Sequence, residues 1–329
     1  MKALEFVSEG VAKVNELSVP EIGDDEVLIA SRAVGVCHSD IELLEGRYII
    51  PFSYPIIPGH EWSGEVMKVG SKVSRFKKGD HVVGDCVIGD DHFGFSISGA
   101  AAEFFVTKES WLHKIPENIS WNNGALVEPF SVAYYALMRV GNVNASDTLV
   151  VLGAGPIGLA VTAASKALGA KTIVVEPVDF RQKAAHELGA DYVCSPDEIK
   201  AVLAKVTEGR GANVVVEATG RPDVMATALE LAGFKGRVAY IGIDVGKSAP
   251  AQLGLIQSKE LTITGSIGSP GVWEETIRFM STKNIDLSPL VTARFTVDEA
   301  LGAVEAAQRP MENIKACLLY TSPSPRDCS

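Results

Sequence analysis

The chain has 329 residues, of which 47% are hydrophobic and 22% are charged, and its formal net charge is −11 at pH 7. This length allows two domains with sizeable cores, and the acidic balance excludes a nucleic-acid-binding protein, which needs a basic surface stripe. The longest apolar runs, such as residues 148–161, are interrupted by glycines and a proline and are too short to cross a membrane.

Residues 1 to about 107 have the pattern of short strands joined by tight turns. Apolar residues dominate 26–30, and Gly-Asp at 79–80 precedes an apolar pair at 82–83. This predicts an antiparallel, β-rich first domain. The first ten residues also lack the basic start and apolar stretch of a secretory signal, which favours a cytoplasmic protein.

A candidate metal site lies within this β-rich part. Residues 35–40 read Gly-Val-Cys-His-Ser-Asp and residues 58–61 read Pro-Gly-His-Glu. A catalytic zinc takes three protein ligands and keeps one position open. Cys37 and His60 would supply a thiolate and an imidazole, and Glu61 or Glu128 a carboxylate. Taken singly, Cys37 is more simply explained as a small buried residue and His60 as a turn histidine.

The cysteines give no sign of a disulfide framework. They lie far apart and without paired spacing, which fits reduced thiols. The five positions are Cys37, Cys86, Cys194, Cys317 and Cys328.

From about residue 145 the pattern changes to strands that alternate with helical stretches. This alternation predicts a doubly wound parallel sheet. The expected strands are 148–152, 171–176, 214–217 and 237–241, and the expected helices are 157–168, 180–188 and 222–231.

A glycine fingerprint joins the first of these strands to its helix. Gly153 permits a tight turn, Gly155 lets the backbone approach a pyrophosphate, and Gly158 lets helix and strand pack closely, with Pro156 and Ile157 opening the helix. The helix N-terminus then binds the anion. The alternative is a glycine-rich turn that serves packing only.

Glu176 ends the next strand, about twenty residues further on, where a carboxylate would meet the ribose hydroxyls. Such a carboxylate repels a 2′-phosphate, so NAD is favoured over NADP. Arg181 follows a few residues later. It either weakens that preference or is a solvated helix residue.

The last part of the chain, 290–295 and 298–308, is expected to return to the first domain. The predicted domains are therefore 1–144 with 286–320, and 145–285. Residues 321–329 are polar and proline-rich and read as a flexible tail or, as we favour, artefactual read-through.

The two motifs, in this order, resemble the zinc-containing medium-chain alcohol and polyol dehydrogenases. The resemblance covers nearly the whole chain, and the Val-Glu-Pro block at 127–129 is most like the sorbitol dehydrogenase branch. Further matching blocks lie at 79–82, 101–104 and 187–191. The resemblance implies an α/β protein with a GroES-like β-rich catalytic domain and a Rossmann cofactor domain.

By this resemblance, Cys37, His60 and one or both of Glu61 and Glu128 hold a catalytic zinc. Asp40 orients His60. Ser39 passes the alcohol proton outward, and the alcohol carbon gives its hydride to NAD.

The loops around Ala218 and Thr219 and around Ile241 and Gly242 resemble those that line the nicotinamide. Ordinary strand ends explain these loops nearly as well.

Two departures from the family pattern affect these expectations. Glu42 stands where many members have a relay histidine, so Glu42, His38 or water receives the proton last. Many members carry a four-cysteine zinc lobe, whereas the corresponding stretch here has only Cys86. A single thiol cannot build such a site, so we predict one zinc per chain and no structural zinc.

The sequence thus predicts a zinc-dependent oxidoreductase that transfers a hydride between NAD and a secondary alcohol of a polyol, sugar or cyclitol. One alternative is a dehydrogenase of threonine-type hydroxy amino acids or amino-polyols, and another is a non-catalytic nucleotide-binding relative. The expected partners are a small alcohol or ketone and further copies of the chain, with no nucleic acid or membrane. A homodimer or homotetramer would form by pairing of the 261–267 strand.

Overall fold

The computed structural model describes residues 1–244 and 246–320, and the predicted tail 321–329 lies outside the described residues. The chain forms two compact units. The first comprises Met1–Glu128, Trp273–Asn284 and the described residues from Val291 onward, and the second comprises Pro129–Val272 and Ile285–Leu290. Residues 273–284 pack with the first unit. The prediction from the sequence places them in the cofactor domain, 145–285. The domain boundaries after residues 144 and 285 stay predictions.

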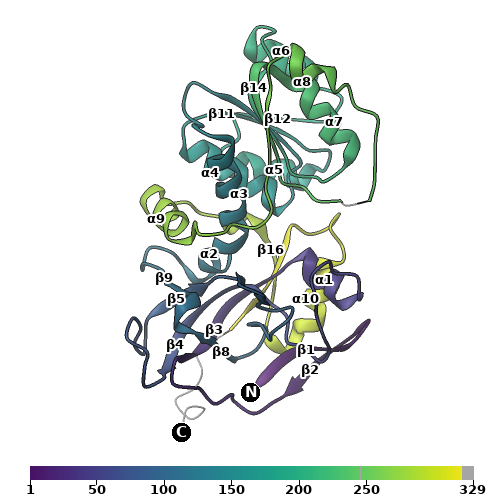
Figure 1. Ribbon diagram of the computed structural model, residues 1–329. Helices are drawn as coiled ribbons and strands as arrows, with labels where there is room; N and C mark the ends of the chain where they lie inside the picture. Colours follow the sequence, from purple (N-terminus) through teal and green to yellow (C-terminus); the bar gives the residue numbers. More distant parts are fainter. Residues whose placement is uncertain (245, 321–329) are drawn as a thin grey trace. The chain divides into compact units, whose positions relative to one another are not determined.

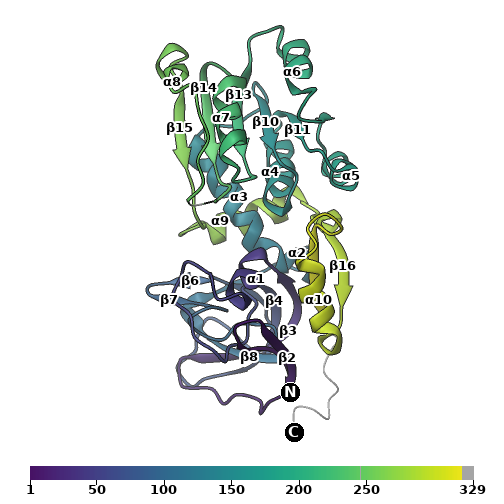
Figure 2. The same ribbon diagram turned by 90° about the vertical axis from the view of Figure 1, so that its right-hand side faces the viewer.

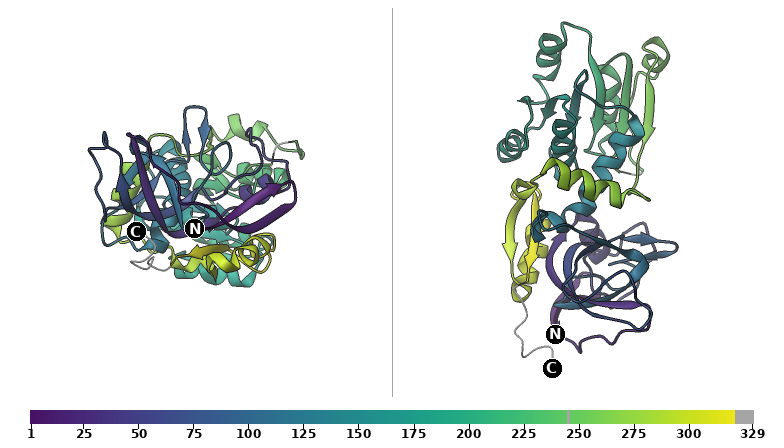
Figure 3. Two further views of the ribbon diagram at one scale, coloured as in Figure 1. Left: turned by 90° about the horizontal axis from the view of Figure 1, so that it is seen from below. Right: turned by 90° about the vertical axis from the view of Figure 1, so that its left-hand side faces the viewer.

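The described residues of the first unit form a seven-stranded sheet, mostly antiparallel (Figure 1). Its order is β16-β17-β3-β4-β5-β9, and β8 also pairs with β3. The C-terminal strand β17 pairs antiparallel with the end of β3, and β16 lies on the other side of β17 at the edge of the sheet (yellow in Figure 3). The strands are β3 (Glu26–Val36), β4 (Glu61–Val69), β5 (His81–Gly84), β8 (Phe104–Lys108), β9 (Leu112–Lys114), β16 (Val291–Phe295) and β17 (Lys315–Leu319).

Two hairpins and several short helices complete this unit. The hairpins pair β1 (Lys2–Ser8) with β2 (Val11–Glu16), and β6 (Val87–Ile88) with β7 (Asp91–His92). The α-helices are α1 (His38–Leu44), α2 (Trp121–Ala125), α9 (Trp273–Lys283) and α10 (Ala300–Ala307), and the 3₁₀ turns are Glu109–Trp111 and Val297–Glu299.

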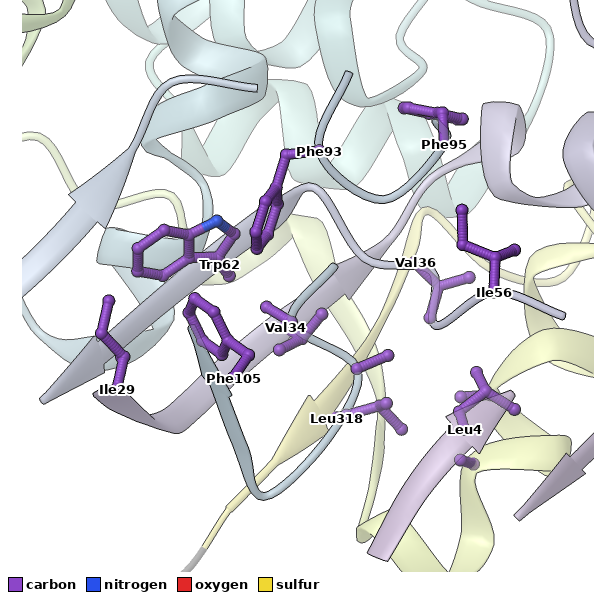
Figure 4. Packing of buried hydrophobic residues seen from close by; sticks show 14 of the residues in the cluster. Leu4, Ile29, Val34, Val36, Ile56, Trp62, Phe93, Phe95, Phe105 and Leu318 are labelled. Carbon is purple, nitrogen blue, oxygen red and sulfur yellow. The ribbon is translucent and has the colours of Figure 1, made fainter. Parts of the chain in front are cut away.

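Aromatic side chains fill the core beneath the long strands β3 and β4 (Figure 4). The ring centroids of Trp62 and Phe105 are 4.7 Å apart, and those of Phe93 and Phe105 are 5.5 Å apart, both edge to face. Aromatic contacts of this geometry stabilise a core beyond their area of burial. The start of β4, which carries the metal-site motif, is thereby held on a rigid layer.

The second unit is built around a six-stranded sheet in the described residues. All pairings are parallel, in the order β12-β11-β10-β13-β14-β15, and Figure 2 shows β15, β14, β13, β10 and β11 side by side. The strands are β10 (Thr148–Leu152), β11 (Lys171–Val175), β12 (Tyr192–Cys194), β13 (Ala212–Glu217), β14 (Ala232–Tyr240) and β15 (Thr262–Gly265).

Helices connect these strands, as parallel pairing requires. The connecting helices are α4 (Pro156–Ala167), α5 (Asp179–Glu187), α6 (Ile199–Thr207), α7 (Pro222–Leu231) and α8 (Gly254–Ser258). The helix α3 (Val127–Val140) precedes the first strand, and a 3₁₀ turn covers Ser288–Leu290. From β10 the chain adds β11 and β12 on one side, and it then returns to add β13, β14 and β15 on the other side of β10. The direction of strand addition therefore reverses next to β10. Ligands of doubly wound sheets bind outside the carboxyl ends of the strands at such a point.

The α/β fold class predicted from the sequence, with a mostly antiparallel β-rich unit and a doubly wound parallel sheet, is confirmed. In the described ranges, no helix is both long and apolar enough to cross a membrane.

Candidate metal and dinucleotide sites

The first candidate ligand, Cys37, lies where β3 ends and α1 begins. It is the N-cap residue of α1, and its backbone N–H donates to Asp40 Oδ2 at 2.8 Å. This bond fixes the turn that presents the thiol. The other oxygen of the same carboxylate, Asp40 Oδ1, lies 3.3 Å from His60 Nδ1. One buried carboxylate therefore places two candidate ligands.

His60 and Glu61 lie at the start of β4, which runs antiparallel to β3. The pairing sets Glu61 opposite Gly35. A Cβ at Gly35 would lie 2.3 Å from Glu61 Oε2, so only glycine leaves room for this carboxylate. The local backbone thus turns His60 and Glu61 toward Cys37.

Cys37, His60 and Glu61 each offer a ligand atom, and these atoms all lie within 4.8 Å of one another. His60 is 6% exposed and Glu61 is 1% exposed. Glu61 Oε2 is buried without a hydrogen-bond partner, and such an atom is costly unless a ligand satisfies it. A thiolate, an imidazole and a carboxylate converging at one buried point fit the donor set of a catalytic zinc.

Glu128, the other candidate carboxylate, lies at the start of α3. Among the described residues it is not a member of that three-residue group, and its Oε1 accepts from Cys86 Sγ at 3.5 Å. Burial raises its pKa, Glu61 raises it further, and His60 and Lys315 lower it.

The electrostatics of the cluster are set by burial and by Asp40. Burial alone would lower the pKa of His60, but the Asp40 carboxylate and Cys37 raise it well above its ordinary value. His60 therefore gains a positive charge readily in the absence of a metal. The raised pKa of His60 reflects the Asp40 carboxylate, which the fold places against the imidazole.

Lys315, on β17, belongs to the cluster although neither sequence motif predicts it. Its Nζ lies 2.7 Å from Glu61 Oε1, and the two side chains are 4% and 1% exposed. Burial alone would lower the pKa of Lys315, but Glu61 and Cys37 raise it, so the ammonium stays charged. A lone lysine inside the apolar stretch 314–320 was a usable signal, because a buried lysine needs a partner.

Tyr48 was also missed. Its ring stacks on Phe95 with centroids 4.5 Å apart, and Phe95 lies 4.8 Å from the His60 ring. Burial raises the pKa of Tyr48 to about 12. Its hydroxyl is therefore protonated at neutral pH and can donate a hydrogen bond beside the cluster.

The relay candidates lie on α1. Ser39 Oγ is 3.5 Å from His60 Nε2. Glu42 Oε1 accepts from Arg47 Nη1 at 2.8 Å, so an arginine already engages this carboxylate.

The glycine fingerprint has the geometry that its three positions require. Gly153 has φ of +95°, a conformation that favours glycine. A Cβ at Gly158 would lie 1.9 Å from the Gly153 carbonyl oxygen, whereas one at Gly155 would meet nothing within 4 Å. The helix α4 starts with Pro156 at its first turn, and Ile157 follows it. The backbone N–H groups of this turn can bind an anion.

Glu176 follows β11 and is 3% exposed. Its Oε2 accepts from Ala154 N at 2.8 Å and its Oε1 from Val178 N at 3.0 Å. The carboxylate is thus fixed against the glycine loop. Arg181 is half-buried on α5, with its guanidinium 5.9 Å from the Phe180 ring.

Two further loops follow the neighbouring strands β13 and β14. The Glu217 carboxylate accepts from the backbone of Thr219 at 2.7 Å, which shapes the turn after Ala218. A Cβ at Gly242 would lie 2.0 Å from Gly220 N. The loops that start at Ala218 and Ile241 therefore pack backbone against backbone at the carboxyl edge that also carries the glycine fingerprint.

Two family models match the chain. The model described as "Alcohol dehydrogenase GroES-like domain" matches residues 23–117, and the model described as "Zinc-binding dehydrogenase" matches residues 156–282.

Curated relatives and solved structures agree with these models. Sorbitol dehydrogenase of Bacillus subtilis is 31% identical over 93% of both chains. (R,R)-butanediol dehydrogenase of Neisseria gonorrhoeae is 32% identical over 95% of this chain and 96% of its own. The crystal structure of 2R,3R-butanediol dehydrogenase from Bacillus subtilis superposes with a TM-score of 0.89 at 30% identity, over 97% of this chain and 99% of that one.

These matches span both units and confirm the resemblance predicted from the motifs, and they support the enzyme over a non-catalytic nucleotide-binding relative. The chain belongs to the zinc-binding alcohol dehydrogenase family with a GroES-like domain, and it is an alcohol dehydrogenase.

Proposed function

We propose that this enzyme oxidises a secondary alcohol of a polyol, sugar or cyclitol with NAD, using one zinc ion held by Cys37, His60 and a carboxylate. The observation that carries the proposal is the group of ligand atoms from Cys37, His60 and Glu61 within 4.8 Å of one another. Cys37, His60 and the carboxylate would hold a zinc ion that supplies Lewis acidity toward the alcohol oxygen, and NAD would supply the hydride acceptor.

The surrounding residues prepare and support this reaction. Asp40 Oδ1 beside His60 Nδ1 stabilises a proton on that nitrogen, so Nε2 keeps its lone pair for a metal. Ser39 Oγ, 3.5 Å from Nε2, accepts the proton of the alcohol hydroxyl and passes it outward. The stacked rings of Tyr48 and Phe95 limit the access of water on one side of His60.

Polar groups beside the cluster support a polyhydroxylated substrate. The Tyr48 hydroxyl and the Glu128 carboxylate offer a donor and an acceptor for hydroxyl groups next to the reacting carbon. Relatives named sorbitol dehydrogenase, (R,R)-butanediol dehydrogenase and D-arabitol-phosphate dehydrogenase act on compounds of this kind.

For the cofactor, we propose NAD at the glycine loop. The pyrophosphate would bind Gly153–Gly158 and the α4 N-terminus, the ribose would meet Glu176, and the nicotinamide would lie against the Ala218–Thr219 and Ile241–Gly242 loops. A zinc-binding dehydrogenase of Sinorhizobium meliloti, 25% identical with a TM-score of 0.89, was solved with NADP. The preference for NAD therefore rests on the negative charge of Glu176, which would repel the 2′-phosphate of NADP. The positive charge of Arg181 would weaken this repulsion.

We further propose a cytoplasmic homo-oligomer with one zinc per chain. The scattered spacing of the cysteines and the absence of a secretory signal pattern in the first ten residues support the cytoplasm. The edge strand β15 and the residues after it expose Ile263 and Ile267, by 37% and 67%, which supports pairing between subunits.

The test is NADH formation with a panel of polyols, cyclitols, simple secondary alcohols, threonine and an amino-polyol, each with and without a chelator. Chelator-sensitive activity on the polyol group supports the proposal. Turnover of threonine or the amino-polyol alone would replace it with the alternative substrate class. A zinc content of two per chain after removal of loosely bound metal would contradict the single site.

A further inference from the structure

Glu61 is shared between the candidate zinc ligands and a buried lysine. One oxygen, Oε1, pairs with Lys315 Nζ at 2.7 Å, and both side chains are almost fully buried, at 1% and 4% exposure. The other oxygen, Oε2, is buried without a hydrogen-bond partner. The carboxylate also belongs to the group with Cys37 and His60.

Strand pairing holds this arrangement in place. Ala316 on β17 is paired with Val36 on β3, so Lys315 lies next to the turn that presents Cys37. Gly35 on β3 faces Glu61 on β4 and leaves room for Oε2. Three strands thus fix the lysine, the carboxylate and the thiol relative to one another.

A fixed ammonium at this place opposes a divalent cation in two ways. It repels the ion through a medium of low dielectric, where charges interact strongly. It also keeps one oxygen of Glu61 engaged, so a metal that takes this carboxylate must share it or break a buried ion pair. In the metal-free protein the same lysine neutralises a carboxylate that would otherwise be buried and unpaired.

We propose that Lys315 is a positioning residue of the metal centre, which competes with zinc for Glu61 and so keeps that ligand position exchangeable for the alcohol. This inference rests on the proposed function. It predicts that Lys315 weakens zinc binding while it stabilises the metal-free protein.

The experiment compares the wild-type protein with Lys315→Met and with Lys315→Arg, which keeps the charge. Zinc release to a chromophoric chelator and the melting temperature with and without zinc are measured. Lys315→Met is expected to release zinc at least roughly ten-fold more slowly than the wild type. Its metal-free form is expected to melt at a lower temperature than the metal-free wild type. Lys315→Arg is expected to behave like the wild type in release.

A purely structural role would give a different result. The melting temperature of Lys315→Met would then fall equally with and without zinc, and zinc release would be unchanged or faster, which overturns the inference. If Lys315→Met does not fold, Lys315→Gln, which retains a donor toward Glu61, carries the same expectation of slower release.

The Glu61→Gln variant tests whether Lys315 acts on zinc through the Glu61 carboxylate. In that background, Lys315→Met is expected to slow release less than it does in the wild type, because the shared carboxylate is gone. An undiminished effect would overturn the competition for Glu61. Wild-type protein that holds no zinc would overturn the proposed function as well, whereas zinc-loaded wild type with unchanged release in Lys315→Met overturns this inference alone.

Discussion

At the scale of single residues, the thiol and the imidazole of the cluster should be needed for chemistry and not for cofactor binding. Cys37→Ser or His60→Ala is expected to lower kcat by roughly a hundred-fold or more, because a Lewis acid supplies several kcal/mol of transition-state stabilisation. NAD affinity should change little, since Gly153–Gly158 and Glu176 belong to the other compact unit. Turnover and NAD titration measure the two effects, with Cys194→Ala as the control thiol. An equal loss of NAD affinity would contradict two separate sites.

Asp40 acts through its neighbours, because it accepts from Cys37 N and lies beside His60 Nδ1. Asp40→Asn keeps the size of the side chain and removes its charge. Zinc affinity is expected to fall by about 10–100-fold, the usual cost of losing a carboxylate behind a histidine ligand. Competition with a chelator measures it. Unchanged affinity would mean that Asp40 serves only the turn before α1.

Glu176 has two roles that a matched pair of variants separates. Its oxygens accept from the backbone of Ala154 and Val178, and its charge would repel a 2′-phosphate. Glu176→Gln keeps an acceptor and removes the charge, while Glu176→Ala removes both. Both are expected to relax discrimination against NADP, and Glu176→Ala should also weaken NAD binding. Unchanged kcat/KM ratios for NAD and NADP in both variants would exclude the charge as the determinant.

At the scale of elements, the pairing of β3 with β4 decides whether Glu61 reaches the cluster. Gly35→Ala would place a Cβ 2.3 Å from Glu61 Oε2. The variant is expected to lose zinc affinity and about 1–3 kcal/mol of folding free energy, because the carboxylate must move within a packed layer. Chelator competition and denaturant unfolding test this, with Gly254→Ala as control, since a Cβ there meets nothing within 4 Å. Wild-type zinc affinity in Gly35→Ala would contradict a role of this close contact in placing Glu61 for the metal.

Helices and strands with a clear hydrophobic periodicity could be predicted from the sequence, but the pairing of distant strands could not. The expected helix 157–168 corresponds to α4 (Pro156–Ala167) and the expected strand 148–152 to β10 (Thr148–Leu152), because glycines and apolar runs mark their ends. The pairing of β17 with β3 joins residues nearly three hundred positions apart. Periodicity carries no information about such a pairing, so the sequence could not reveal that Glu61 is the partner of Lys315.

At the scale of the whole molecule, association should depend on the edge of the parallel sheet. Ile267 is 67% exposed just beyond β15, and Lys in its place would put a charge into an apolar interface. Ile267→Lys is expected to reduce the mass measured by light scattering to that of a smaller assembly. Met311→Lys, at an equally exposed residue of the other unit, is the control. An unchanged mass for Ile267→Lys would place the interface elsewhere.

The sequence by itself determined the family, the order of the two units and the candidate residues of both sites. These follow from local motifs, since a glycine fingerprint or a Cys-x-Ser-Asp turn needs only neighbouring residues. Only the tertiary structure decided that Glu61 joins Cys37 and His60 while Glu128 contacts Cys86, and that Lys315 pairs with Glu61. Those contacts depend on the register of distant strands, which is set by packing of the whole sheet and not by any stretch of the chain alone.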